Sequence, residues 1–164
     1  MVAKLPLPVR FGAQAGERRD HVVLMSWNLN NLGDPRDKAK LGAIAEVLLQ
    51  PRNPGWAVPD VAALQEIDEP KALDALLDMV NPVLALRGEA PFESVLGKPD
   101  GNNGKRLAIL YRADLPLLDS RFYPGTQGHD RVELLRRGLL HAKLAIPVGQ
   151  PGSRQAYDVL DVFD

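Results

Sequence analysis

Two short apolar segments of the sequence each end at a polar residue, and a segment with helical spacing lies between them. Val22–Leu29 and Asp60–Gln65 are predicted to be short buried strands, because both are apolar runs of strand length. Asn28 lies at the end of the first run, and Glu66 directly follows the second. Lys38–Leu49 carries its apolar residues at helical spacing. A strand, a helix and a second strand in this order favour a sheet covered by helices.

The rest of the chain adds a second helix and a series of strands. Helix-start signals, in which a capping acceptor precedes a proline, occur at Asp34-Pro35 and at Asp68–Pro70. After Pro82 the pattern changes from helical to strand-like. The later predicted strands are Phe92–Gly97, Arg106–Arg112, Leu117–Tyr123, Arg137–Ile146 and Ala156–Phe163. The first two of these are predicted to form a hairpin. The predicted order is β-α-β-α followed by four or five strands, which is an α+β fold.

Composition sets limits on the kind of protein. The 164 residues suffice for one domain with its own core, and residues 1–20, which lack periodicity, are predicted to be a flexible lead-in to a domain over residues 21–164. The absence of cysteine excludes disulfides and cysteine-bound zinc. A net charge of −1 gives no electrostatic support for nucleic acid binding. No segment reaches the roughly 18 apolar residues of a membrane span, and no signal peptide is visible. The sequence therefore leaves cytoplasmic and secreted locations equally open.

Asn28 and Glu66 are the residues with the clearest chemical potential. Each has a simpler explanation, since Glu66 can be a solvated residue at the rim of the sheet and Asn28 can be a turn former. If the two strands are neighbours in one sheet, however, an amide and a carboxylate meet at one edge. Two hard oxygen ligands suit Mg²⁺, which keeps several of its waters and also binds substrate phosphates.

Four segments, SWNLNNLG, PDVAALQEID, RLAILYR and RRGLLHAKL, resemble the endonuclease/exonuclease/phosphatase superfamily in their order and spacing. This family includes deoxyribonucleases, apurinic/apyrimidinic endonucleases, sphingomyelinases and inositol polyphosphate 5-phosphatases. The WNLNNLG variant is most similar to bacterial nuclease-like members. The resemblance runs from about Val22 to the end of the sequence. It implies the N-terminal half of a four-layer α/β/β/α sandwich, with a mixed, mostly antiparallel sheet and helices on one face.

The resemblance also implies roles for three residues. Asn28 matches an asparagine that helps to hold the metal and the scissile phosphate, and Glu66 matches the family's magnesium ligand. Arg137 matches a position that contacts the substrate phosphate in some members. This third match is loose, because Leu139 replaces the usual nearby proline, and an ordinary exposed strand residue is an equal alternative. The implied cofactor is Mg²⁺, with Mn²⁺ as the alternative, and the implied substrate is a phosphoester, with nucleic acid favoured.

Motifs that the family carries in its second half do not occur in this sequence: a histidine after the next strand, an Asp-x-Asn motif and an Asp-His pair. We therefore expect the chain to be the N-terminal portion of a metal-dependent phosphodiesterase or phosphatase and to be inactive alone. We also expect its sheet to leave an apolar face open, to be covered by a missing C-terminal half or by a second chain. The alternative is a noncatalytic binding module or a decayed copy that uses this exposed face.

Overall fold

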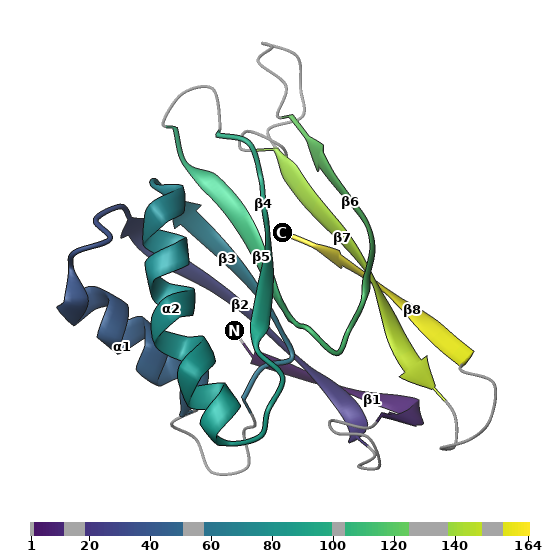
Figure 1. Ribbon diagram of the computed structural model, residues 1–164. Coiled ribbons are helices and arrows are strands. Elements are labelled where there is room, and N and C mark those ends of the chain that lie inside the picture. The colour runs from purple at the N-terminus through teal and green to yellow at the C-terminus, as the bar shows by residue number, and fades with distance from the viewer. Residues whose placement is uncertain (1, 12–18, 51–57, 100–103, 125–137, 149–155) are drawn as a thin grey trace.

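Within residues 2–11, 19–50, 58–99, 104–124, 138–148 and 156–164, which the structure describes, the computed structural model contains two helices and eight strands (Figure 1). The elements are β1 (Val2–Phe11), β2 (Arg19–Leu32), α1 (Lys38–Leu49), β3 (Val61–Ile67), α2 (Pro70–Leu86), β4 (Phe92–Leu96), β5 (Arg106–Arg112), β6 (Leu117–Tyr123), β7 (Leu139–Val148) and β8 (Ala156–Phe163). From β2 onward, this confirms the predicted order of β-α-β-α followed by strands.

The first sheet has the strand order β1-β2-β3-β5-β4. β2 and β3 run parallel and are connected through α1, whereas the other neighbouring pairs are antiparallel. The sheet is therefore mixed and mostly antiparallel, as expected. The pairing of β4 with β5 confirms the predicted hairpin.

The segment that was expected to be a flexible lead-in differs from the prediction. β1 lies within it and pairs antiparallel with β2, from Val2 opposite Met25 to Pro6 opposite His21. β2 accordingly begins at Arg19 rather than at Val22. The prolines of β1 are compatible with this position because β1 is an edge strand, where a missing N–H need not interrupt a ladder.

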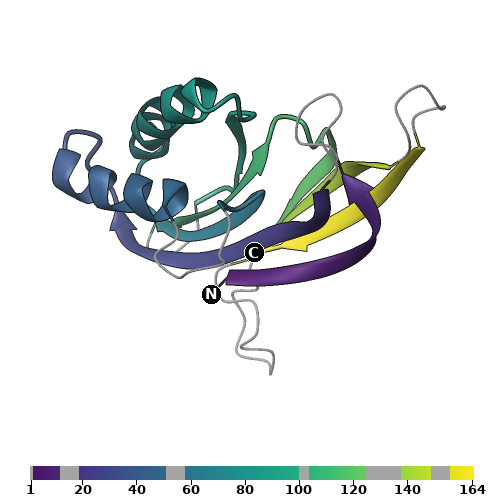
Figure 2. The same cartoon turned by 90° about the horizontal axis from the view of Figure 1, so that it is seen from below.

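The two helices cover one face of the first sheet (Figure 2). α1 is capped by Asp37, whose side chain accepts a hydrogen bond from the Lys40 N–H at 3.0 Å. The helix therefore begins three residues after the predicted Asp34-Pro35 signal, where Asp34 instead accepts from the Arg36 N–H in a turn. α2 begins at Pro70 as predicted. Among the described residues, no helix has the length and apolarity needed to cross a membrane.

The sheet-covering helices form a core with the side of the first sheet that they face. The buried face of α1 is the one predicted from its spacing, and α2 also buries one apolar face. The buried residues are Leu41, Ile44, Ala45, Leu48 and Leu49 in α1 and Ala72, Leu73, Leu76, Val80 and Leu84 in α2. They pack against Met25, Ala62, Leu64 and Ala108 of the sheet.

A second sheet of order β6-β7-β8, antiparallel throughout, covers the other face of the first sheet. The core between the sheets contains Val22, Val61, Ile109 and Tyr111 from the first sheet and Leu140, Ala142, Leu144 and Ile146 from β7. The expectation that the first sheet would leave its apolar face open is therefore wrong. The chain supplies enough strands to close this core itself.

Some apolar side chains that remain exposed lie instead on the outer side of the second sheet, beside charged residues such as Asp161. Val159 and Phe163 alternate with residues of the core and are 54% and 57% exposed. His141 lies beneath the Phe163 ring, with the ring centroids 4.6 Å apart, and its Nε2 is 2.8 Å from Asp161 Oδ1. This side of β7, which carries His141 and Lys143, is thus partly buried by its own neighbours.

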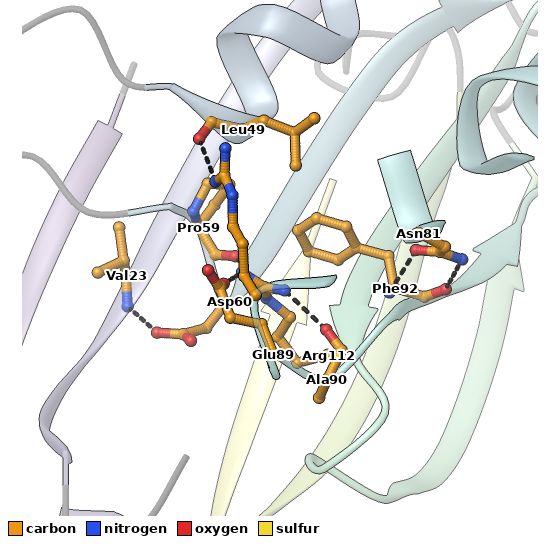
Figure 3. A network of polar contacts seen from close by, with 10 residues as sticks. Val23, Leu49, Pro59, Asp60, Asn81, Glu89, Ala90, Phe92 and Arg112 are labelled. Atoms are coloured by element: carbon orange, nitrogen blue, oxygen red, sulfur yellow. Dashed lines mark hydrogen bonds and ion pairs between the residues drawn. The ribbon is translucent and has the colours of Figure 1, made fainter. Parts of the chain in front are cut away.

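A buried arginine fastens the first sheet at the amino end of β3 (Figure 3). Arg112, the last residue of β5, is 1% exposed and lies 2.8 Å from the Glu89 carboxylate. Its guanidinium also donates to the carbonyls of Pro59 and Ala90 and stacks over the Phe92 ring at 4.5 Å. The network joins the loop before β3, the segment before β4 and the end of β5, so it holds the end of the sheet that is opposite Glu66.

Candidate functional site

The candidate site lies where β2 and β3 end side by side. The parallel register runs from Leu24 opposite Val61 to Asn28 opposite Gln65, the residue that precedes Glu66. The two strands are therefore neighbours, and their polar ends occur at the same edge of the sheet. This is the arrangement on which the predicted convergence of Asn28 and Glu66 depends.

The register is interrupted directly after Asn28. It resumes at Leu32 opposite Ile67, so three residues of β2 are accommodated opposite the single residue Glu66. Asn30, Asn31 and Glu66 all have positive φ angles of 51°, 66° and 65°. Asparagine adopts this left-handed conformation readily, whereas for Glu66 it costs on the order of 1–3 kcal/mol. Strained backbone of this kind is concentrated at functional sites.

Two lysine side chains from other parts of the chain hold this irregular segment. Lys40 Nζ of α1 donates to the Asn30 and Asn31 carbonyls at 2.6 and 2.8 Å. Lys105 Nζ, next to β5, lies 3.0 Å from Glu66 Oε2 and also donates to Asn31 Oδ1. The Glu66 side chain is only 12% exposed, so this ion pair supplies a positive charge to a carboxylate with little access to water.

The Asn28 side chain is exposed, and its Oδ1 accepts a hydrogen bond from the Asn30 N–H at 2.8 Å. This contact is the turn-forming role that the sequence offered as the simpler explanation. It does not use up the oxygen, because an amide oxygen has two lone pairs. Asn28 can therefore stabilise the turn and still offer an oxygen to a ligand.

A second carboxylate reaches the same edge from the other sheet. Asp164, directly after β8, accepts a hydrogen bond from the Gln65 side-chain amide, which also donates to Ser26 Oγ at 3.4 Å. Burial raises the pKa of Asp164 to about 6, although hydrogen bonds from Gln65 and from the Ala108 backbone partly oppose this shift. Among the described residues, the second oxygen of Asp164 is buried without a hydrogen-bond partner.

The donors at this edge fit a hard divalent cation in their chemistry. Asn28 and Glu66 offer an amide oxygen and a carboxylate, and Mg²⁺ is commonly held by one or two carboxylates together with several waters. Within the described part of the chain, no group of three or more His, Cys, Asp or Glu residues is placed to hold a metal. Any cation at this edge would thus depend on water or substrate for much of its coordination.

The remaining predicted site residue, Arg137, lies outside the described residues. Sequence reasoning did not single out Lys105, Gln65 or Asp164. Lys105 is separated from Glu66 by 39 positions, and Asp164 from Gln65 by 99. Only the pairing of β3 with β5 and the packing of the two sheets bring these side chains to the edge, so no local spacing could have indicated them.

A model of the Endonuclease/Exonuclease/phosphatase family matches residues 25–161. A search of the curated proteins finds no match. Among solved structures, a family protein from Bacteroides thetaiotaomicron is 18% identical to this chain, with a TM-score of 0.46. The aligned region covers 87% of this chain and 50% of the Bacteroides protein. The catalytic domain of human Nocturnin is 16% identical to this chain, with a TM-score of 0.44. The aligned region covers 98% of this chain and 52% of the Nocturnin domain. TDP2 from Caenorhabditis elegans is 17% identical to this chain, with a TM-score of 0.45. The aligned region covers 83% of this chain and 33% of TDP2. The chain thus spans half or less of the length of two of these structures and about half of the third.

Proposed function

Because the chain belongs to the endonuclease/exonuclease/phosphatase family, whose members are phosphoester hydrolases, we propose that it carries part of the active site of a divalent-metal-dependent phosphodiesterase or phosphatase. The observation that supports the proposal is the parallel pairing of β2 with β3, which brings the strand ends that carry Asn28 and Glu66 side by side. The nearly buried Glu66 carboxylate, held in a left-handed conformation, gives this edge the character of a functional site.

The proposed roles follow from the side chains. Glu66 would supply the charged oxygen that holds Mg²⁺, or Mn²⁺ in its place, and Asn28 a neutral oxygen for the ion or for the scissile phosphate. Arg137 is proposed to contact the substrate phosphate. A bound cation supplies two things to such a reaction, a water with a lowered pKa and positive charge beside the phosphate oxygens. The buried setting of Glu66 would strengthen its attraction for that ion.

We propose nucleic acid as the first substrate class to test. The net charge of −1 provides no general field for a polyanion, so recognition would depend on the site and not on the overall charge. A small phosphoester and a lipid headgroup present the same phosphate chemistry, and parallel assays with representatives of the three classes would separate them.

The cation site can be tested by titrating the ¹⁵N-labelled chain with Mg²⁺. We expect the amide signals around Asn28 and Glu66 to shift and those shifts to disappear in Glu66→Gln. Glu93→Gln is a matched control, because Glu93 lies on β4, opposite Tyr111 of β5 near the other end of the sheet, and glutamine keeps an acceptor for the Tyr111 hydroxyl. Shifts that persist in Glu66→Gln would contradict the proposed site.

We further propose that the 164-residue chain has no appreciable turnover alone. The proposed cation site rests on Asn28 and Glu66, and the described residues include no group of three or more His, Cys, Asp or Glu residues that could complete it. The assay is hydrolysis of bis(p-nitrophenyl) phosphate and of a labelled oligonucleotide with Mg²⁺ or Mn²⁺. Turnover that Glu66→Gln abolishes would contradict this part of the proposal.

The second candidate function is a noncatalytic binding module, and the exposed outer side of the second sheet favours it. Leu118, Val159 and Phe163 are each more than half exposed there or at its edge. We propose that a further segment of the domain or a second chain covers this surface. Absence of cation binding at Glu66, together with capture of such a partner, would favour the module over the hydrolase.

A further inference from the structure

Lys105 occupies a position that a cation at Glu66 would need. Its Nζ is 3.0 Å from Glu66 Oε2, and the same ammonium donates to Asn31 Oδ1. Lys105 and Glu66 are 21% and 12% exposed, so water screens their interaction only weakly. Lys105 immediately precedes Arg106, which pairs with Ile67 of β3, and the sheet itself therefore fixes where the lysine backbone lies.

The contact meets a requirement of the protein without a metal. A carboxylate with so little exposure is costly unless a positive charge or hydrogen bonds satisfy it. Lys105 provides both to Glu66, and through Asn31 it also joins the two left-handed segments at the ends of β2 and β3. Lys40 donates instead to the Asn30 and Asn31 carbonyl oxygens.

A divalent cation and an ammonium cannot share this carboxylate without strong repulsion, because like charges a few ångströms apart in a weakly screened setting oppose each other. We propose that Lys105 is a positioning residue that holds Glu66 when no cation is bound and that must leave it when one binds. Lys105 then competes with the cation and lowers the affinity of the site. This inference rests on the proposed function, since it takes Glu66 as the ligand.

The test is equilibrium binding of Mn²⁺, followed by the loss of the free-ion electron paramagnetic resonance signal. Lys105→Met should bind Mn²⁺ at least about fivefold more tightly than the wild type, because this little-exposed pair should contribute no less than the upper end of the range for exposed ion pairs. Lys105→Arg keeps the charge and should resemble the wild type. Lys143→Met is the matched control, because Lys143 lies 3.8 Å from Asp161 on the second sheet and should leave the affinity unchanged.

Equal or weaker Mn²⁺ binding by Lys105→Met would overturn the inference. Glu66→Gln distinguishes this failure from a failure of the proposed function. If Glu66→Gln loses Mn²⁺ binding while Lys105→Met matches the wild type, Glu66 is a ligand and only the competition is refuted. If Glu66→Gln binds as the wild type does, the site itself is refuted. Circular dichroism verifies folding of each variant, and Lys105→Gln replaces Lys105→Met if the latter does not fold.

Discussion

Replacing Arg112 with methionine should destabilise the fold while leaving the candidate site intact. The substitution keeps an unbranched side chain of similar length but removes the ion pair with Glu89 and the donors to the Pro59 and Ala90 carbonyls. It also removes the stacking on Phe92. Because Arg112 is 1% exposed, water cannot readily replace these partners.

The magnitude follows from those contacts. Each carbonyl left without a donor costs about 1–3 kcal/mol, and breaking a buried ion pair by removing one partner costs about 3–5 kcal/mol. Glu89 is 31% exposed and can recover part of its hydration, and the methionine side chain adds apolar burial. Since a buried methionine side chain recovers about 1.5–3 kcal/mol, we expect the free energy of unfolding to fall by about 3–5 kcal/mol, near the lower end of the net range.

The assay is urea denaturation followed by far-ultraviolet circular dichroism. Arg121→Met is the matched control, since Arg121 forms a 3.0 Å ion pair with Asp119 but is 66% exposed, and its loss should cost less than about 1 kcal/mol. A loss in Arg112→Met no larger than that in Arg121→Met would show that the buried network does not stabilise the fold. Folded Arg112→Met should still bind Mn²⁺ with wild-type affinity, because the network lies at the end of the sheet opposite Glu66.

Three further predictions concern single residues. Burial raises the pKa of Asp164 from 3.8 to about 6, so the folded protein binds this proton more tightly than the unfolded chain does. The stability that Asp164 contributes is therefore fully present below pH 3.8 and is lost as the pH rises through 6. The loss amounts to at most about 3 kcal/mol. In Asp164→Asn, the free energy of unfolding should no longer decrease over this pH range. Gly138→Ala should destabilise by about 2 kcal/mol or more in thermal unfolding, because Gly138 has a φ of +83° and an added Cβ would lie 2.7 Å from the Phe122 ring. Asp37→Ala should cost about 1 kcal/mol through loss of the helix cap, and Asp34→Ala less, a difference that urea denaturation would measure.

Much of the fold follows from local patterns in the sequence. The spacing of apolar residues in Lys38–Leu49 predicts both the extent of α1 and its buried face. Arg106–Arg112, Leu117–Tyr123 and Ala156–Phe163 coincide with β5, β6 and β8. These segments are predictable because each has apolar or alternating residues bounded by turn-forming ones.

The parts that could not be predicted depend on pairing between distant segments. β1 contains two prolines and no clear periodicity, and it is a strand only because β2 lies beside it. Alternation in β7 shows that one side is buried but not what buries it, which is why the closure of the core by the second sheet was missed. A pattern of residues identifies a buried side, whereas the partner of that side is a property of the whole fold.

Part of the candidate site could be predicted from local patterns in the sequence, and part depends on the pairing of distant segments. Asn28 and Glu66 are visible in the sequence because each ends an apolar run, and the parallel pairing of β2 with β3 brings those ends to one edge. The family match confirms the resemblance on which their proposed roles depend. Lys105 carries no comparable signal, since a lysine beside a turn is ordinarily solvated. Its contact with Glu66 exists only because β5 returns alongside β3.

The central claim is that the edge formed by Asn28 and Glu66 holds a divalent cation. Its most direct test is X-ray diffraction from crystals of the chain grown with Mn²⁺ and measured where manganese scatters anomalously. If Glu66 is a ligand, one anomalous peak lies at roughly 2 Å from a Glu66 carboxylate oxygen, with Asn28 facing it and Lys105 moved away from Glu66. A peak elsewhere, or an undisturbed contact between Lys105 and Glu66 with no manganese beside it, would show that this edge does not hold the cation.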